Sequence, residues 1–190
     1  VCNPLKRNND GTYSMDFDNL AQVADGKCKI LLLSNPHNPA GILWDRHTLM
    51  RLADFCFDRG ILVVSDEIHC DMALWGLRHI PFASVSDKAA QCSITFGAPT
   101  KTFNIAGIVS SYSIVPDSQI RKTFYNWLQA NELGDPTMFA PIATMAAFTD
   151  EGEEWRRAML EYVEENIKFV EYFCLEYSSV TSAGFVSYMA

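Results

Sequence analysis

Three polar segments, each following an apolar run, carry the residue types that could do chemistry in this chain. They are residues 35–41 (Asn-Pro-His-Asn-Pro-Ala-Gly), residues 65–69 (Ser-Asp-Glu-Ile-His) and residues 97–107, which include Lys101. The amine of Lys101 could form a Schiff base, and the carboxylate of Asp66 could hold a proton on a ring nitrogen. These two groups suit the cofactor pyridoxal phosphate, which needs both.

The spacing of the first two segments predicts that Asn38 and Asp66 lie at the same edge of a sheet. The stretch between them has the length of one loop, one helix and one strand, so both should emerge at the carboxyl ends of nearby strands. There Asn38 could donate to the phenolic oxygen of the cofactor, and His69 could reach the same oxygen. We interpret His37 as structural.

Each of these residues also has an ordinary explanation when taken alone. Asp66 and Glu67 could be a solvated strand end, and Asn38 could belong to an Asn-Pro turn. His69 could be a hydrogen-bonded structural residue and Lys101 a surface lysine. The occurrence of all three segments in this order is what favours a cofactor site.

The surroundings of Lys101 in the sequence predict an activated amine. An apolar strand and a proline precede it, and Thr-Phe-Asn and Ile-Ala-Gly follow it. We therefore expect a confined, partly apolar loop, in which a lysine loses its proton more easily and becomes a nucleophile.

A strand, a helix and a second strand are predicted to position the first two segments. The apolar run at residues 29–33 and the one at residues 61–64 are typical of strands buried in a parallel sheet. Between them, Asp45 can cap a helix that runs to about Arg59. The three elements form a right-handed crossover unit of an α/β fold, whose ligands bind at the carboxyl ends of the strands.

Lys101 lies on the connection between two further predicted strands, residues 92–96 and 109–114. The connection is too short for a helical crossover, so we expect this pair to be antiparallel. Helices follow at about 117–130, 136–149 and 153–177, the last with apolar residues at spacings of three and four. The sequence thus predicts a mostly parallel sheet with one antiparallel strand and helices on both faces.

Composition and charge restrict the class of protein. The 190 residues are 48% hydrophobic and 20% charged, as in a globular domain. The net charge of -8 argues against nucleic acid or an anionic membrane as a partner. The six cysteines include no Cys-x-x-Cys pair, so we expect buried thiols in a reducing cytoplasm. No apolar run approaches the ~18 residues of a membrane span, and no leader for export is visible.

The three segments resemble, in order and spacing, the class I and II aminotransferases, which are fold-type I pyridoxal-phosphate enzymes. His69, the stretch at residues 79–84 (His-Ile-Pro-Phe-Ala-Ser) and Lys-Thr-Phe-Asn-Ile-Ala-Gly at 101–107 are more narrowly similar to the MalY/PatB branch, the cystathionine beta-lyases. Many aminotransferases carry Tyr where this chain has His69. The resemblance covers nearly the whole chain but only the middle of the family's chain.

The resemblance implies a role for five residues of the site. Lys101 is expected to be the Schiff-base lysine, Asp66 the partner of the pyridine nitrogen, and Asn38 and His69 the neighbours of the phenolic oxygen. Thr100 is the remaining hydroxyl near the phosphate. Ala98 and Val109 stand where many aminotransferases use Ser and Arg to hold that group.

The resemblance also implies a reaction and an organisation. The parent enzyme is expected to perform beta-elimination on a sulfur amino acid such as cystathionine, giving a thiol, pyruvate and ammonia, with Lys101 as general base. It is expected to be a homodimer. Residues 1–165 would be part of the large cofactor-binding domain, and residues 166–190 the end of a linking helix and the start of a small domain.

Three alternatives to the lyase remain open at this point. Transamination shares every step through proton abstraction. A non-catalytic cofactor-sensing module would need an attached DNA-binding segment, and the sequence has no basic or helix-turn-helix pattern. The phosphate-binding turn, the aromatic residue that stacks on the cofactor and the arginine for the substrate carboxylate all lie in family segments outside the resemblance. The third alternative is therefore a truncated module that folds but does not turn over substrate.

Overall fold

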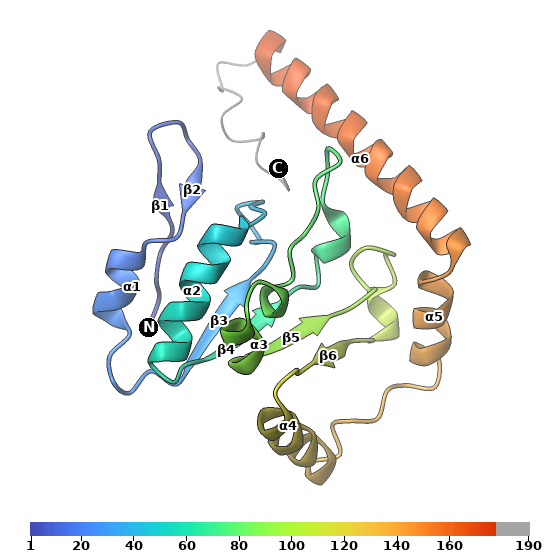
Figure 1. The fold of residues 1–190 in the computed structure, drawn as a ribbon. Helices are drawn as coiled ribbons and strands as arrows, with labels where there is room; N and C mark the ends of the chain where they lie inside the picture. Colours follow the sequence, from blue (N-terminus) through green and yellow to red (C-terminus); the bar gives the residue numbers. More distant parts are fainter. Residues whose placement is uncertain (178–190) are drawn as a thin grey trace.

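A four-stranded mixed sheet lies at the centre of the computed structural model, which describes residues 1–177 (Figure 1). Its strands lie in the order β3 (Ile30–Ser34), β4 (Leu62–Asp66), β5 (Ser93–Gly97) and β6 (Tyr112–Ile114). β3, β4 and β5 are parallel, and β6 runs antiparallel to β5. The predicted mostly parallel sheet with one antiparallel strand is confirmed.

Helix α2 (Arg46–Asp58) makes the predicted crossover from β3 to β4. The Asp45 side chain caps it by accepting a hydrogen bond from Thr48 N at 2.8 Å. Leu49, Leu52 and Cys56 recur at helical spacing and are completely or almost completely buried against the sheet. The apolar face of α2 is therefore the main cover of the β3–β4 pair.

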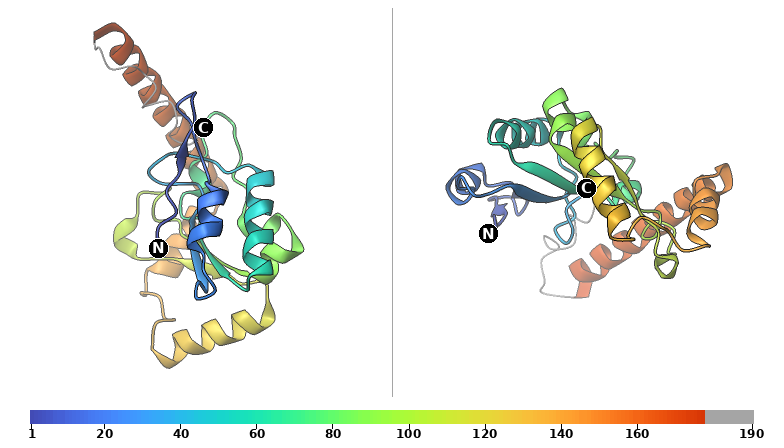
Figure 2. Two further views of the ribbon diagram at one scale, coloured as in Figure 1. Left: turned by 90° about the vertical axis from the view of Figure 1, so that its left-hand side faces the viewer. Right: turned by 90° about the horizontal axis from the view of Figure 1, so that it is seen from below.

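Helical segments lie on both faces of the sheet, but they cover the faces unequally (Figures 1 and 2). On one face, α2, α3 (Asp87–Gln91) and the 3-10 turn η2 (Phe82–Ser84) enclose a core that includes Leu33 and Val63. On the other, α4 (Ser118–Ala130) approaches β5 through an edge-on contact of Phe124 with Phe96, whose ring centroids are 5.9 Å apart. Leu32 of β3, on that second face, is 78% exposed.

The remaining elements flank the sheet. A short hairpin of β1 (Lys6–Arg7) and β2 (Tyr13–Ser14) precedes α1 (Phe17–Val23). The 3-10 turns η1 (Cys70–Met72) and η3 (Ala106–Ile108) follow β4 and precede β6. These turns belong to the two loops that carry the predicted site.

The two last helices differ from the predicted bounds. α5 (Ala140–Ala147) begins later than residue 136, with a proline in its first turn and another, Pro136, in the extended segment before it. α6 (Asp150–Tyr177) begins earlier than residue 153, because the Thr149 hydroxyl accepts from Gly152 N at 3.2 Å and caps it.

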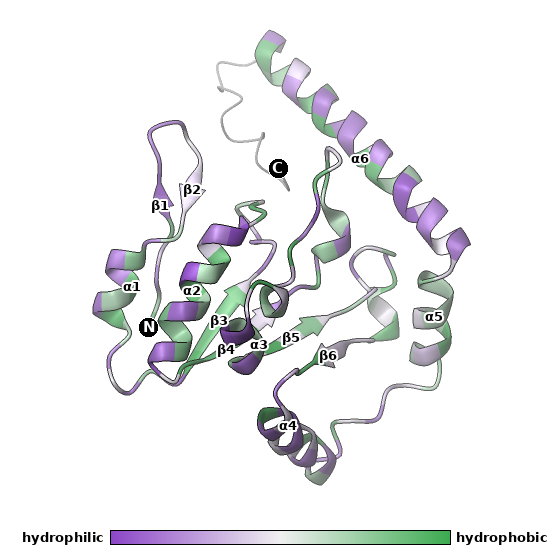
Figure 3. Cartoon of the chain, viewed as in Figure 1, coloured by the Kyte–Doolittle hydropathy of each residue, from purple (hydrophilic) through white to green (hydrophobic). Residues whose placement is uncertain are grey.

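Helix α6 runs without interruption through the domain boundary expected near residue 165. It extends away from the sheet, and its residues alternate between hydrophilic and hydrophobic types (Figures 2 and 3). A small domain that starts at residue 166 stays a prediction, because residues 178–190 lie outside the described part. Within residues 1–177, no helix is long and apolar enough to cross a membrane.

Candidate active site

Asp66 is the last residue of β4, at the carboxyl end of the parallel strands. It pairs with Ser34 of β3 and Phe96 of β5 in the sheet register. Its side chain is exposed, and Oδ1 accepts a hydrogen bond from Ile68 N at 3.3 Å. A carboxylate at this edge of the sheet is available to a ligand.

The segment with Asn38 is fastened to the same edge, as its spacing predicts. Asn35 N donates to the Asp66 carbonyl oxygen at 2.9 Å, and Asn38 N donates to Ser34 Oγ at 3.1 Å. His37 contacts Trp44 edge-on and accepts from Ala40 N at its Nδ1, at 3.4 Å. These contacts agree with the interpretation of His37 as structural.

Lys101 lies in a tight helical turn directly after β5. Phe103 N donates to the Pro99 carbonyl oxygen at 2.9 Å, and Ile105 N donates to that of Thr100 at 3.0 Å. Pro99 and Thr102 are buried and Thr100 is half-buried, whereas the Lys101 side chain is exposed. The loop is therefore confined, but the Lys101 side chain itself is not.

The charges of Asp66, in the same segment, and of Lys101, in the third segment, both influence His69. Its ring is half-buried, and this burial lowers its pKa below the usual 6.5. The carboxylate of Asp66 opposes that lowering of the pKa, and the ammonium of Lys101 adds to it. Two charged groups from different segments thus act on one imidazole, and the lowered pKa favours the neutral form of His69 at pH 7.

Two buried polar atoms beside these residues have no hydrogen-bond partner in the described part of the chain. They are Nδ1 of His69 and the hydroxyl oxygen of Thr102, whose residue is 2% exposed. Sequence reasoning selected Thr100 as the nearby hydroxyl and did not single out Thr102. The alternation of Thr100, Lys101 and Thr102 gave no sign of which hydroxyl would be buried.

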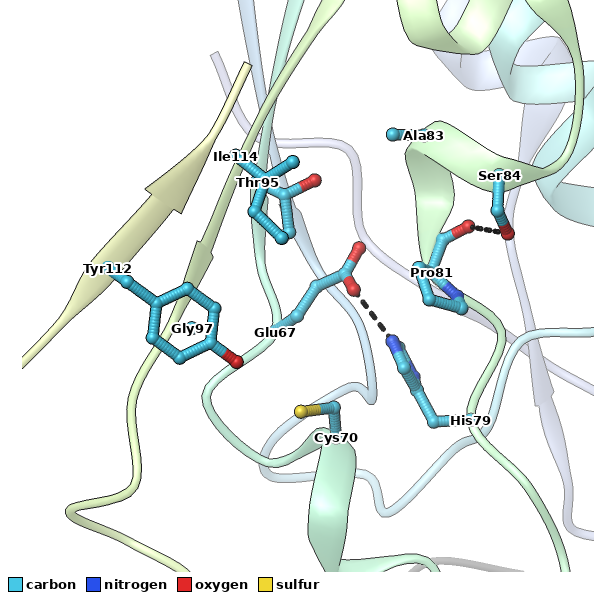
Figure 4. Close-up of a pocket in the computed structure, with 10 residues that line it drawn as sticks. All are labelled: Glu67, Cys70, His79, Pro81, Ala83, Ser84, Thr95, Gly97, Tyr112 and Ile114. Carbon is cyan, nitrogen blue, oxygen red and sulfur yellow. Dashed lines mark hydrogen bonds and ion pairs between the residues drawn. The ribbon is translucent and has the colours of Figure 1, made fainter. Parts of the chain in front are cut away.

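Glu67 is not part of a solvated strand end, which corrects one of the sequence-based alternatives. It is 3% exposed, and its Oε1 accepts from Ser65 Oγ at 2.8 Å and from Phe82 N at 2.9 Å. Its Oε2 lies 2.7 Å from His79 Nε2 (Figure 4). The sequence signal that was missed is the alternation of side chains along β4. Residue 67 follows residues 63 and 65 on the face of the strand that the helices cover.

A pocket of about 330 Å³ lies on the Glu67 side of the sheet (Figure 4). Its lining includes Thr95, Gly97 and Tyr112, together with Cys70. Burial is the main cause that raises the pKa of Cys70 and that of Tyr112 to about 12 each, so both are protonated at neutral pH. Because successive strand residues point to opposite faces, this pocket is separate from the exposed carboxylate of Asp66.

Comparison with known proteins identifies the family of this chain. The sequence model of the family described as aminotransferase class I and II matches residues 3–189. Cystathionine beta-lyase PatB of Bacillus subtilis (strain 168) is 44% identical over 172 residues, which are 90% of this chain and 44% of PatB. The chain thus spans less than half the length of this relative.

Two solved structures are similar in fold and in sequence. The pyridoxal-phosphate-bound putative aminotransferase from Clostridium difficile 630 has a TM-score of 0.87 at 37% identity, over 93% of this chain and 45% of that one. The pyridoxal-phosphate-bound C-S lyase from Staphylococcus hominis has a TM-score of 0.80 at 34% identity, over 93% and 44%. The sheet and its helices are therefore those of fold-type I enzymes.

Proposed function

Since the chain belongs to the aminotransferase class I and II family, we propose that it forms the centre of a pyridoxal-phosphate-dependent carbon–sulfur β-lyase. The substrate class is a small sulfur amino acid such as cystathionine, and the products are a thiol, pyruvate and ammonia. The proposal rests on one observation above all. Asp66 ends β4 and Lys101 lies in the turn after β5, and both act electrostatically on the half-buried imidazole of His69 at the carboxyl end of the sheet.

The residues at this edge fit pyridoxal phosphate chemically. The cofactor offers a ring nitrogen, a phenolic oxygen, an aldehyde and a phosphate. The exposed carboxylate of Asp66 suits the first of these, and the exposed amine of Lys101 suits the aldehyde. The partnerless buried atoms His69 Nδ1 and Thr102 Oγ1 are polar groups that a ligand with several oxygens could satisfy.

Each residue has a distinct task in this proposal. Pyridoxal phosphate, when bound, withdraws electrons from the α-carbon of an amino acid through its protonated ring. Asp66 holds the proton on the ring nitrogen by a charge-assisted hydrogen bond. Lys101 supplies the amine for the aldehyde and the base for the α-proton. His69 and Asn38 bind at the phenolic oxygen, and Thr100 binds toward the phosphate.

The neutral state of His69 is suited to that position. Its imidazole stays uncharged at neutral pH because burial lowers its pKa. A neutral ring can donate one hydrogen bond to the phenolic oxygen without placing a second positive charge beside Lys101.

The lyase is preferred over the aminotransferase because of the identity to PatB, a protein named as a cystathionine beta-lyase. The C-S lyase of Staphylococcus hominis supports the same choice. An aminotransferase is the second candidate, since the structure from Clostridium difficile is described as a putative aminotransferase. Both reactions need the same Asp66 and Lys101.

Cofactor binding is tested by adding pyridoxal phosphate, reducing the mixture with borohydride and locating the modified lysine by peptide mass spectrometry. We expect the adduct on Lys101 and its loss in Lys101→Ala. Lys122→Ala is the matched control, because Lys122 is an exposed lysine on α4. An adduct spread over several lysines, or one that survives in Lys101→Ala, would contradict the assignment.

The reaction is tested by supplying cystathionine and measuring thiol and pyruvate, against an amino acid with a keto acid acceptor. Release of thiol and pyruvate without a keto acid supports the lyase. Turnover that depends on the keto acid and releases no thiol would contradict the lyase assignment and favour the aminotransferase. Inactivity of this chain by itself stays a prediction, which turnover in the same assay would contradict.

Assembly and location belong to the same proposal. A homodimer would cover apolar side chains that α5 leaves exposed, among them Ile142 at 65% and Met145 at 74%. The cysteines of residues 1–177 form no disulfide with one another, which favours a reducing cytoplasm. Sedimentation of the chain with and without pyridoxal phosphate tests the dimer.

A further inference from the structure

The buried carboxylate of Glu67 joins the end of β4 to two other segments of the chain, the loop at residues 79–82 and the segment that begins at Asn35. Oε1 accepts from Ser65 Oγ and from Phe82 N, with Asn35 Nδ2 at a longer 3.4 Å. Oε2 faces His79 Nε2 (Figure 4). Burying a carboxylate is unfavourable unless both oxygens are hydrogen-bonded, and here both have donors.

The backbone of Glu67 connects Asp66 to the turn that carries His69. Glu67 N donates to the Phe96 carbonyl oxygen at 2.8 Å, which extends the pairing of β4 with β5 past Asp66. The Glu67 carbonyl oxygen accepts from Cys70 N at 2.9 Å and closes the turn around His69. A displacement of Glu67 would therefore move Asp66 and His69 together.

We propose that Glu67, held by Ser65, Phe82 and His79, is a positioning residue that fixes Asp66 and His69 in the arrangement the cofactor needs. This inference rests on the proposed function, since it concerns the same site. Glu67 does not itself touch the ligand, because its side chain faces the pocket on the opposite side of the sheet. It acts through the backbone that it holds in place.

The alternative is that the Glu67 carboxylate only fastens η2 to the sheet. In that case its removal would lower the stability of the fold and leave the site unchanged. The two roles are separated by a measurement at His69, whose environment depends on the turn that Glu67 closes.

The test compares Glu67→Ala with Glu67→Gln, following the imidazole of His69 by NMR as pH is varied. We expect the titration midpoint of His69 to rise toward its ordinary value in Glu67→Ala, because a loosened turn exposes the ring. Glu67→Gln should restore the wild-type midpoint. Its amide oxygen can accept from Ser65 and Phe82, and its amide nitrogen can donate to His79 Nε2 in the other tautomer.

Ser93→Ala is the matched control. Ser93 is also completely buried, and its Oγ donates to the Ala89 carbonyl oxygen at 2.7 Å at the far end of β5. This variant should lower the melting temperature without moving the His69 midpoint. If Glu67→Ala does not fold, Ser65→Ala removes a single donor to Oε1 and should shift the midpoint in the same direction. A midpoint equal to wild type in a folded Glu67→Ala or in Ser65→Ala overturns the proposal.

Cofactor affinity provides the second readout. Glu67→Ala should weaken pyridoxal phosphate binding by about tenfold or more, by analogy with the loss found when outer-shell partners of metal ligands are removed. Unchanged affinity in that variant would leave Glu67 with a structural role only. If the wild-type chain forms no adduct at Lys101, the proposed function fails, and the His69 midpoints still decide whether Glu67 sets the turn.

Discussion

Gly97 and Tyr112 lie opposite each other in the β5–β6 pair, and the Tyr112 ring occupies the space that a side chain at residue 97 would need (Figure 4). Only glycine lets the ring approach the β5 backbone this closely. Gly97 is also the last residue of β5, directly before the turn that carries Lys101. The packing of one glycine therefore connects the pocket on one face of the sheet with the position of Lys101.

Gly97→Ala should destabilise the fold and disturb the Lys101 turn. The added methyl group overlaps Tyr112, and overpacking of this kind costs about 1–3 kcal/mol. We expect a lower free energy of unfolding in urea and less borohydride-fixed adduct on Lys101. Gly107→Ala is the control, because no atom lies within 4 Å of a Cβ at residue 107. Equal stability of the two variants would refute the packing explanation.

Thr102→Val should stabilise the chain and weaken its binding of pyridoxal phosphate. The valine removes a buried hydroxyl that has no partner in the described residues, a defect that costs about 1 kcal/mol or more. The same hydroxyl would be available to the cofactor, so affinity should fall as stability rises. Thermal melts and a cofactor titration measure the two effects.

Thr95→Val separates these two effects. Thr95 is 5% exposed and its hydroxyl also lacks a partner in the described part of the chain, but it lines the pocket on the other face. This variant should raise the melting temperature and leave the affinity unchanged. A parallel loss of affinity in both variants would mean that Thr102 has no specific part in the site.

The sequence predicted the elements around the site well because its local signals agree with the tertiary structure. The apolar runs before Asn35 and Ser65 became parallel strands, and the Asp45 cap began α2 as predicted. The short connection around Lys101 correctly indicated an antiparallel pair. Each of these rests on periodicity, chain length or capping, which the sequence contains directly.

The role of Glu67 could not be read from the sequence in the same way. Whether a carboxylate at a strand end is solvated or buried depends on which segment packs over it. Here that segment is the loop around His79 and Phe82, which is distant along the chain. The exposure of Lys101 was missed for a related reason, since an apolar composition does not determine which side of a turn a residue occupies.

The stability of the chain should fall as pH drops below about 6.5, the ordinary pKa of histidine. Burial lowers the pKa of His69 and that of His37 in the folded state. These histidines therefore bind protons more readily in the unfolded chain than in the folded one. Their contribution to the unfolding free energy is complete above the pKa of the unfolded state and is lost as pH falls through the pKa of the folded state. Urea unfolding between pH 5 and pH 8 measures the slope.

Replacing one of these histidines should flatten that dependence on pH. In His69→Gln the decline of the unfolding free energy between pH 7 and pH 5 should be smaller than in wild type. His47→Gln serves as the control, because His47 is exposed on α2. A His69→Gln curve parallel to wild type would show that burial of His69 does not couple to folding.

Trp155→Ala should loosen the Lys101 turn by removing its contact with helix α6. The Phe103 ring, in that turn, stacks on Trp155 of α6 with ring centroids 5.7 Å apart and meets Phe148 edge-on at 5.9 Å. Aromatic pairs of this kind contribute about 1 kcal/mol beyond the area they bury. The first turns of α6 should stay in place, since Arg156 Nη1 still donates to the Asp71 carbonyl oxygen at 3.0 Å.

The expected result is a melting temperature lower by about 2–4 °C for each kcal/mol lost, together with less adduct on Lys101 at a fixed cofactor concentration. Trp127→Ala is matched in side chain and exposure, since Trp127 is 56% exposed on α4 and Trp155 is 46% exposed on α6. Because Trp127 does not stack on the Lys101 turn, its removal should leave the adduct at the wild-type level. Equal adduct in the two variants would show that Phe103 holds the turn without α6.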